Sequence, residues 1–184
     1  MSKLIPRLSM AELNPQLALM LRPKVERLNY LGEFFQCTAH QPQALMSFYR
    51  LTEDLKHALP DNLTELVALT IGAATGNSYE RVQHERLSLK LGFNESWVRE
   101  VLSLKMEAGG ALSEVERLVQ NFALVVIERQ GHNTSDELGA VVKAIGHEQA
   151  VAVLMLIGRY MMHALIVNSL ELEPPVTSPL EEKK

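Results

Sequence analysis

Two helices joined by a short turn are predicted in residues 62–91, NLTELVALTIGAATGNSYERVQHERLSLKL. Asn62 followed three residues later by Glu65 has the spacing of a capping box, in which each side chain bonds a backbone N–H group at the start of a helix. Apolar residues then recur at helical spacing as far as Ala74. Gly76 and Asn77 loosen the backbone before a second helical run. This pair of helices indicates a helical fold.

Similar start and stop signals predict further helices along the rest of the chain. The predicted segments are about 11–21 ending near Pro23, an apolar stripe from Val25 to Phe35, 42–60 between two prolines, 94–102, a run from the Ser113–Glu116 capping box to before Gly131, 135–146, and 147–170. Sustained period-two alternation between hairpin turns, which would predict strands, is not seen. The sequence therefore predicts an all-α bundle in a single domain.

The last predicted helix, residues 147–170, is apolar nearly all the way round. Such a helix is usually buried on several sides at the centre of a bundle or at a subunit interface. Arg159 and His163 interrupt it too early for a membrane span, so no membrane partner is expected. We interpret it as a buried helix and expect self-association.

Composition argues against several classes of protein. The 184 residues carry 18 Lys and Arg against 22 Asp and Glu, a formal charge of −4, without a dense basic run, so no nucleic-acid partner is expected. The single cysteine, Cys37, cannot form an internal disulfide or a two-cysteine redox centre within one chain. Its neighbours Phe34 and Phe35 favour an inert core position. Because residues 1–10 lack the apolar stretch of a signal peptide, we expect a cytoplasmic protein.

Polar groups that can do chemistry converge on the second helix of the opening stretch. Asn77, Glu80 and His84 stand at i, i+3 and i+7, so all three project from one helix face. A carboxylate beside an imidazole raises the proton affinity of the histidine and orients its ring, as a general acid or base requires. The same spacing occurs in solvated surface pairs. Glu65 is equally well explained by its capping box, and Tyr79 by packing.

The same stretch resembles the carboxymuconolactone decarboxylase family, which includes the alkylhydroperoxidase D-like proteins. The resemblance covers Ala39-His40-Gln41-Pro42, Thr64-Glu65-Leu66, the run from Gly76 to His84, Ile157-Gly158-Arg159-Tyr160-Met161 and Leu165-Ile166-Val167-Asn168. It implies an all-helical domain over residues 29–172, preceded by an N-terminal helical extension of residues 1–28. The polar composition of residues 173–184 predicts a flexible tail. The resemblance also implies a homo-oligomer, a trimer or hexamer, with the active site at or near a subunit interface.

The resemblance also favours one kind of chemistry. The redox branch of the family has Glu, Cys, Cys and His where this chain has Glu65, Asn77, Glu80 and His84, so both cysteines that thiol peroxidase chemistry requires are missing. The decarboxylase branch also lacks the cysteine pair, keeps the histidine and needs no cofactor. The resemblance therefore implies a cofactor-independent acid–base enzyme of decarboxylase type, acting on a small carboxylated or lactone-like substrate.

Candidate residues follow from this interpretation. The catalytic candidates are His84, Glu80, Tyr79 and Glu65, and the substrate-binding candidates are Asn77, Arg81, His40, Arg159 and His163. His84 is expected to transfer the proton and Glu80 to orient its ring. Arg81 is expected to hold a substrate carboxylate. No metal site is expected, because no two histidines and a carboxylate share a specific ligand spacing.

Two other functions remain open on the sequence. An alkylhydroperoxidase-type oxidoreductase needs an essential thiol, and Cys37 is the sole cysteine. A non-catalytic oligomeric binding protein would have kept the fold after losing its chemistry. A pocket that is closed, or lined only by apolar side chains, would favour the binding protein.

Overall fold

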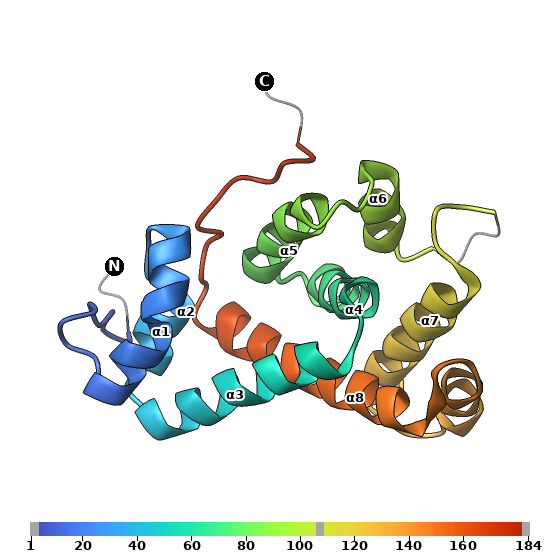
Figure 1. The fold of residues 1–184 in the computed structure, drawn as a ribbon, viewed down its shortest axis with the longest axis horizontal. Helices are drawn as coiled ribbons and strands as arrows, with labels where there is room; N and C mark the ends of the chain where they lie inside the picture. The colour runs from blue at the N-terminus through green and yellow to red at the C-terminus, as the bar shows by residue number, and fades with distance from the viewer. Residues whose placement is uncertain (1–3, 106–108, 182–184) are drawn as a thin grey trace.

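A computed structural model describes residues 4–105 and 109–181, and it confirms the all-α fold. Within those residues the chain forms eight helices and no strand (Figure 1). The helices are α1 (Pro15–Leu28), α2 (Glu33–Thr38), α3 (Pro42–Ala58), α4 (Asp61–Ala74), α5 (Ser78–Lys90), α6 (Glu95–Ser103), α7 (Glu114–Glu128) and α8 (Ser135–Ser169).

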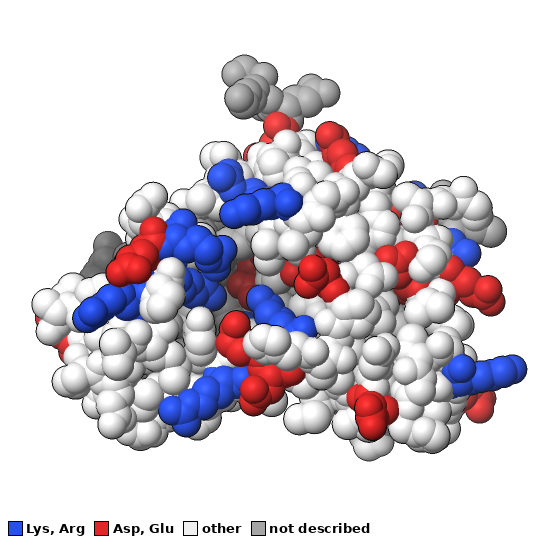
Figure 2. Space-filling model, viewed as in Figure 1, with Lys and Arg blue, Asp and Glu red and all other residues white. Residues whose placement is uncertain are grey.

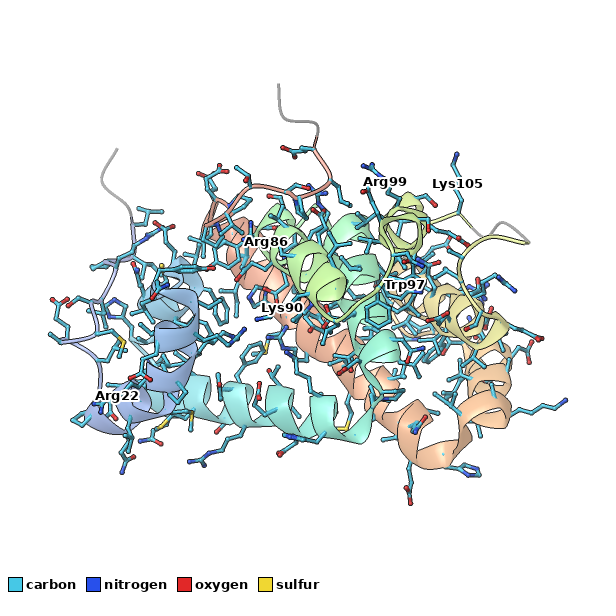
Figure 3. All side chains as sticks on the ribbon, turned by 45° about the horizontal axis from the view of Figure 1, so that its top comes forward. Arg22, Arg86, Lys90, Trp97, Arg99 and Lys105 are labelled. Atoms are coloured by element: carbon cyan, nitrogen blue, oxygen red, sulfur yellow. The ribbon has the colours of Figure 1, made fainter. Side chains whose placement is uncertain are left out.

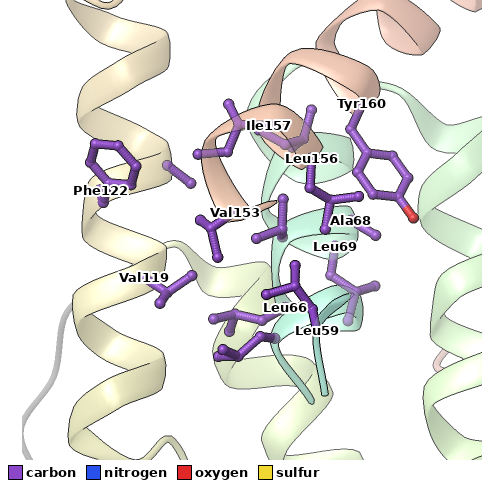
Figure 4. Packing of buried hydrophobic residues seen from close by; sticks show 14 of the residues in the cluster. Leu59, Leu66, Ala68, Leu69, Val119, Phe122, Val153, Leu156, Ile157 and Tyr160 are labelled. Atoms are coloured by element: carbon purple, nitrogen blue, oxygen red, sulfur yellow. The ribbon is translucent and has the colours of Figure 1, made fainter. Parts of the chain in front are cut away.

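Helix α4 lies at the centre of the main hydrophobic core. Residues 63–72 are all buried, because α5, α6, α7 and α8 pack around this helix (Figure 1). Leu66 and Leu69 belong to one apolar cluster with Phe122 of α7 and Leu156 of α8 (Figure 4). Burial of each such side chain contributes about 1.5–3 kcal/mol. Packing around α4 therefore fixes the positions of the helices that carry the polar residues described below.

Helix α8 consists of two helices that meet at Gly146. This glycine has φ 80° and ψ 169°, a conformation that other residues rarely adopt, so the chain turns there. By length and composition α8 can cross a membrane, but its apolar 18-residue window is 56% buried inside the protein. It packs against α3, α4 and α7, in agreement with the predicted buried helix. Its outer face leaves five apolar side chains exposed: Val151, Leu154, Met155, Met162 and Leu165.

The N-terminal helices form a second apolar cluster beside the main core. Leu17 and Leu21 of α1 are fully buried in it with residues of α2 and α3. The predicted helix end near Pro23 is wrong, because α1 continues through this proline. A proline removes one hydrogen bond to the carbonyl four residues earlier, here that of Leu19. Leu19 is exposed, so water can satisfy that carbonyl group.

The two predicted capping boxes have opposite outcomes. The Ser113–Glu116 box at the start of α7 is confirmed, since each side chain accepts the backbone N–H of the other residue. The Asn62–Glu65 box is wrong, because α4 begins before Asn62 and Pro60 takes the N-cap position. Asn62 instead donates to Glu116 Oε1 at 3.0 Å. Glu65 lies one turn further into α4, where its side chain faces α5.

Residues 173–181 run along the outside of α5 and α6 (Figure 1). Ser178 Oγ donates to the buried Glu85 carboxylate of α5. Arg99 of α6 donates to the Leu180 carbonyl at 3.0 Å, and the Leu180 side chain packs against the main core.

Candidate active site

A cavity of about 130 Å³ lies between α1, α2, α3, α5 and α8. Ionisable and hydrogen-bonding side chains in its wall include Thr52, Tyr79, Glu80, His84, Arg159, Tyr160 and His163. The rings of Phe34, Phe35 and Phe48 supply a flat apolar surface. A cavity with an apolar wall and a few convergent polar groups is the usual form of a small-molecule site.

His84 is held by a carboxylate that the sequence does not place beside it. Its Nδ1 lies 2.7 Å from Glu65 Oε2, across the contact between α5 and α4. Glu65 is buried, does not line the cavity, and also accepts from Ser88 Oγ at 3.3 Å. Burial would lower the pKa of His84, but the carboxylates of Glu65 and Glu80 raise it above its ordinary value. Glu65 therefore orients the ring and favours its protonated form.

The second nitrogen of His84 faces the cavity groups. Nε2 lies 3.5 Å from Glu80 Oε1 and 3.3 Å from the Tyr160 hydroxyl. Burial raises the pKa of Tyr160, so its phenol keeps its proton at neutral pH. With Nδ1 bonded to Glu65, a proton on His84 Nε2 points toward Glu80 and the cavity. The four side chains form a chain of acid–base groups that runs from the core of the protein to the cavity.

Glu80 is the charged centre of the site. Its carboxylate lies 3.2 Å from Arg159 Nη1 and 3.4 Å from His163 Nε2, in addition to its contact with His84. Burial would raise the pKa of Glu80, but His163, the His84 hydrogen bond and the Arg159 guanidinium hold it well below its ordinary value. Glu80 is therefore ionised at neutral pH.

Asn77 caps the start of α5 and determines which ring nitrogen of His163 carries the proton. Its Oδ1 accepts the Glu80 backbone N–H as the N-cap of the helix, which directs its Nδ2 toward His163 Nδ1 at 3.3 Å. Nδ1 must then accept, so the proton of neutral His163 sits on Nε2 and points at Glu80. Burial lowers the pKa of His163 to about 4, with smaller contributions from nearby cations, so this ring is neutral at pH 7.

Arg159 is anchored on three sides although it lies on an apolar helix. Its Nε donates to Thr52 Oγ1 at 2.9 Å, and its Nη1 pairs with Glu80. The guanidinium also lies over the rings of Tyr160 and Phe48, 4.2 and 4.8 Å from their centroids. These contacts compensate for the cost of burying the charge and fix it beside Glu80.

The structure brings most of the predicted residues together. Seven of the candidates are involved in this network or line the cavity: Glu65, Asn77, Tyr79, Glu80, His84, Arg159 and His163. Burial raises the pKa of Tyr79, whose hydroxyl accepts the Phe34 backbone N–H at 3.3 Å. The shortest carboxylate contact of His84 is with Glu65, whereas the sequence assigned the orienting role to Glu80.

Three predicted substrate-binding residues do not line the cavity. Arg81 turns away from it and pairs with Glu85 at 2.5 Å, so the predicted contact with a substrate carboxylate there is not supported. His40 bonds the Pro6 carbonyl at 2.9 Å and lines a separate groove. Asn77 uses its side chain for the helix cap and for His163, as described above.

The cavity-wall residues that sequence reasoning missed include Lys24, Thr52, Phe48 and Tyr160. Tyr160 follows Arg159 and precedes His163 by three residues, so its helical position was a usable signal. Cys37 lies instead in the separate apolar groove of about 570 Å³, between α2, α3 and the end of α8. Among the described residues, no group of three or more His, Cys, Asp or Glu side chains is arranged to hold a metal ion.

The helical architecture is shared with solved structures. A peroxidase-related protein with an alkylhydroperoxidase AhpD core from Ralstonia eutropha JMP134 has 16% identity and a TM-score of 0.79, over 92% of this chain and 90% of that chain. The debrominase Bmp8 in complex with 2,3,4-tribromopyrrole has 16% identity and a TM-score of 0.78, over 94% and 92%. A putative antioxidant defence protein AhpD from Agrobacterium tumefaciens has 17% identity and a TM-score of 0.66, over 76% and 96%. The fold is thus alkylhydroperoxidase D-like.

Residues 42–130 match the model of the Carboxymuconolactone decarboxylase family. The matched segment includes residues 76–84, where the sequence resembles this family, and the chain lacks the cysteine pair of the redox branch. The matched segment contains α4 and α5, with Glu65, Glu80 and His84, and leaves α1 and α8 outside. No curated protein matches the chain.

Proposed function

We propose that this protein is a cofactor-independent acid–base enzyme of decarboxylase type that acts on a small carboxylated or lactone-like molecule. The observation that carries the proposal is the buried chain of Glu65, His84 and Glu80, which ends in a cavity of polar and aromatic side chains. This lining argues against a binding protein with a wholly apolar pocket.

The proposed reaction needs a proton at one step. When the bond between the substrate carbon and its carboxylate breaks, carbon dioxide leaves and the electron pair is delocalised as a dienolate. The imidazolium of His84 then donates its Nε2 proton to a substrate carbon, and solvent replaces that proton. Glu65 stabilises the charged ring, and ionised Glu80 holds the Nε2–H in the direction of the cavity.

The proposal also covers the location and the oligomeric state of the enzyme. We expect a cytoplasmic homo-oligomer, a trimer or hexamer, and the exposed apolar face of α8 supports self-association. Sedimentation of the purified protein tests this, and a monomer at micromolar concentration would contradict it.

The test is a decarboxylation assay of wild-type protein with carboxymuconolactone, alongside His84→Ala and a control. His84→Ala is expected to lower kcat by about 10²–10⁴-fold, the range for a lost general acid. His147→Ala, which removes an exposed histidine of α8, is the matched control and should keep full activity. Circular dichroism shows whether each variant is folded. Wild-type turnover unaffected by His84→Ala would refute the assignment.

A peroxide assay separates the redox alternative. Thiol-dependent peroxide reduction that is lost with Cys37→Ser, in a protein without lactone turnover, would overturn the acid–base proposal. We expect no such activity, because Cys37 is buried and lines the apolar groove rather than the cavity of His84.

A further inference from the structure

Helix α1 lies outside the segment that matches the family, yet it forms one wall of the cavity. Leu17, Leu21, Lys24 and Leu28 follow one another at intervals of four, three and four residues, so they share one helix face. Leu17 and Leu21 are fully buried, and Leu21, Lys24 and Leu28 line the cavity. The chain thus places an ammonium group where an apolar side chain is the usual choice.

The Lys24 ammonium makes no hydrogen bond or ion pair within residues 4–105 and 109–181. Its described contacts are with the faces of two aromatic rings, 4.8 Å from the Phe35 centroid and 5.8 Å from the Tyr49 centroid. A cation that is partly removed from water without a counter-ion raises the free energy of the unliganded protein. An anion in the cavity would remove that cost.

The charges that act on Lys24 come from α3, α5 and α8. Burial lowers the pKa of Lys24 to about 8; Lys56 of α3 and Arg159 of α8 lower it further, while Glu80 of α5 and Glu53 of α3 oppose the shift. The amine is therefore still mostly protonated at pH 7.

The charge balance of the cavity also favours an anion. Its charged lining residues, among those described, are Lys24, Arg27, Lys56 and Arg159 against Glu53 and Glu80. Arg159 and Glu80 neutralise each other at 3.2 Å. The remaining groups are three cations and one carboxylate, and Figure 2 shows Lys and Arg side chains gathered around a hollow on this face.

We propose that Lys24 binds the anionic group of the ligand, and that the ligand is a small monocyclic carboxylate whose ring lies against the Phe34, Phe35 and Phe48 wall. The cavity measures about 130 Å³, and an apolar cavity of about 150 Å³ holds one benzene molecule. The inference rests on the proposed function in one respect, namely that the cavity beside His84 is the substrate site. It makes Lys24 a positioning residue that sets the preferred charge of the substrate.

The experiment compares two probes of equal size, 4-fluorobenzoate and 4-fluorobenzamide, by fluorine NMR titration of the purified full-length protein at pH 7. We expect the wild type to bind the benzoate at least about tenfold more tightly than the benzamide, because only the benzoate offers a charge-assisted contact. Lys24→Met should remove this preference and leave benzamide binding unchanged. Lys24→Arg should restore most of it.

Two further variants serve as controls for the binding experiment. Lys143→Met removes an exposed lysine from the first part of α8 and should bind both probes as the wild type does. Lys24→Gln serves as a second variant should Lys24→Met fail to fold. Equal affinity of the wild type for both probes, equal weakening of both by Lys24→Met, or no binding of either probe would each overturn the proposal.

A pH titration provides a second readout that a structural role would not change. Benzoate affinity of the wild type is expected to fall as the pH rises above about 8, where free Lys24 loses its proton. The benzoate affinity of the Lys24→Arg variant should stay constant up to pH 10. Because binding is measured without turnover, Lys24-dependent benzoate binding in a protein that decarboxylates nothing would refute the proposed reaction and leave this inference standing.

Discussion

Two buried glutamates, Glu116 and Glu80, each lie at the centre of a polar network in this protein, and of the two only Glu80 lines the cavity described above. Glu116 accepts from Ser113, from Asn62 Nδ2 at 3.0 Å and from Trp97 Nε1 at 3.2 Å. Trp97 lies among the side chains between α6 and α7 in Figure 3. Burial would raise the pKa of Glu116, but these hydrogen bonds keep it below its ordinary value.

The Glu80 network differs in what surrounds it. Its partners are ionisable groups, Arg159, His84 and His163, and all of them line the cavity. Glu116 bonds neutral groups that tie three helices together and is absent from that lining. The difference teaches that a buried carboxylate with a lowered pKa does not by itself mark a functional site. Access to a cavity, and partners that can exchange protons, separate the two.

The largest expected effect comes from Glu80→Gln, measured against Glu116→Gln. Loss of the Glu80 charge should lower kcat for the lactone by about 10²–10⁴-fold, because His84 Nε2 loses the group that directs its proton. Glu116→Gln should leave kcat unchanged at temperatures where it is folded. Steady-state kinetics of both variants checks this. Equal losses in kcat would erase the distinction between the two networks.

Glu116→Ala is expected to destabilise the fold. It removes a capping box and leaves the Trp97 and Asn62 donors without their acceptor, for a loss of about 3–4 kcal/mol in unfolding free energy. Urea unfolding measures it, and the exposed Glu148→Ala is the control. A loss below about 1 kcal/mol would show that water replaces the carboxylate.

Part of the pH dependence of stability should come from the lowered pKa of His163. Its folded pKa of about 4 lies below the unfolded value of about 6.5, so the unfolded chain binds the extra proton first. The stability that neutral His163 contributes is therefore complete above pH 6.5 and is lost as the pH falls toward 4. Between pH 7 and 4, the unfolding free energy of His163→Gln should fall by on the order of 2–3 kcal/mol less than that of the wild type. The exposed His132→Gln is expected to follow the wild type, and parallel curves for all three proteins would contradict the prediction.

The smallest effect is expected for Arg81→Lys. Lysine keeps the charge beside Glu85, so stability should change by less than about 1 kcal/mol and KM should not move. Arg159→Lys is the contrasting variant, since it loses the bonding geometry to Thr52 and Glu80 and should lower kcat. A raised KM for Arg81→Lys alone would reinstate Arg81 as the substrate-binding arginine.

The sequence is informative wherever the structure depends on neighbours along one helix. The common face of Asn77, Glu80 and His84, the Ser113 capping box and the buried final helix all follow from local periodicity, and the structure contains each of them. The candidate residues on α5 were found for that reason.

Contacts between helices were not predictable in the same way. Glu65 and His84 are 19 residues apart, and only the packing of α4 on α5 brings them to 2.7 Å. Local spacing assigned Glu65 to a cap that α4 does not use, because Pro60 starts the helix earlier. The place of Lys24 in the cavity wall was not predictable either, because the position of α1 against the cavity depends on the second apolar cluster.

The two bonds made by Asn77 have a consequence for the evolution of this fold. Asn77 and Glu80 stand where the resemblance places the two cysteines of the redox branch. A cysteine at position 77 would take away both the helix cap and the donor that fixes the His163 tautomer, and a cysteine at position 80 would leave buried Arg159 without its carboxylate. Each single exchange therefore removes contacts to His163 or Arg159, which couples residues 77 and 80 to α8.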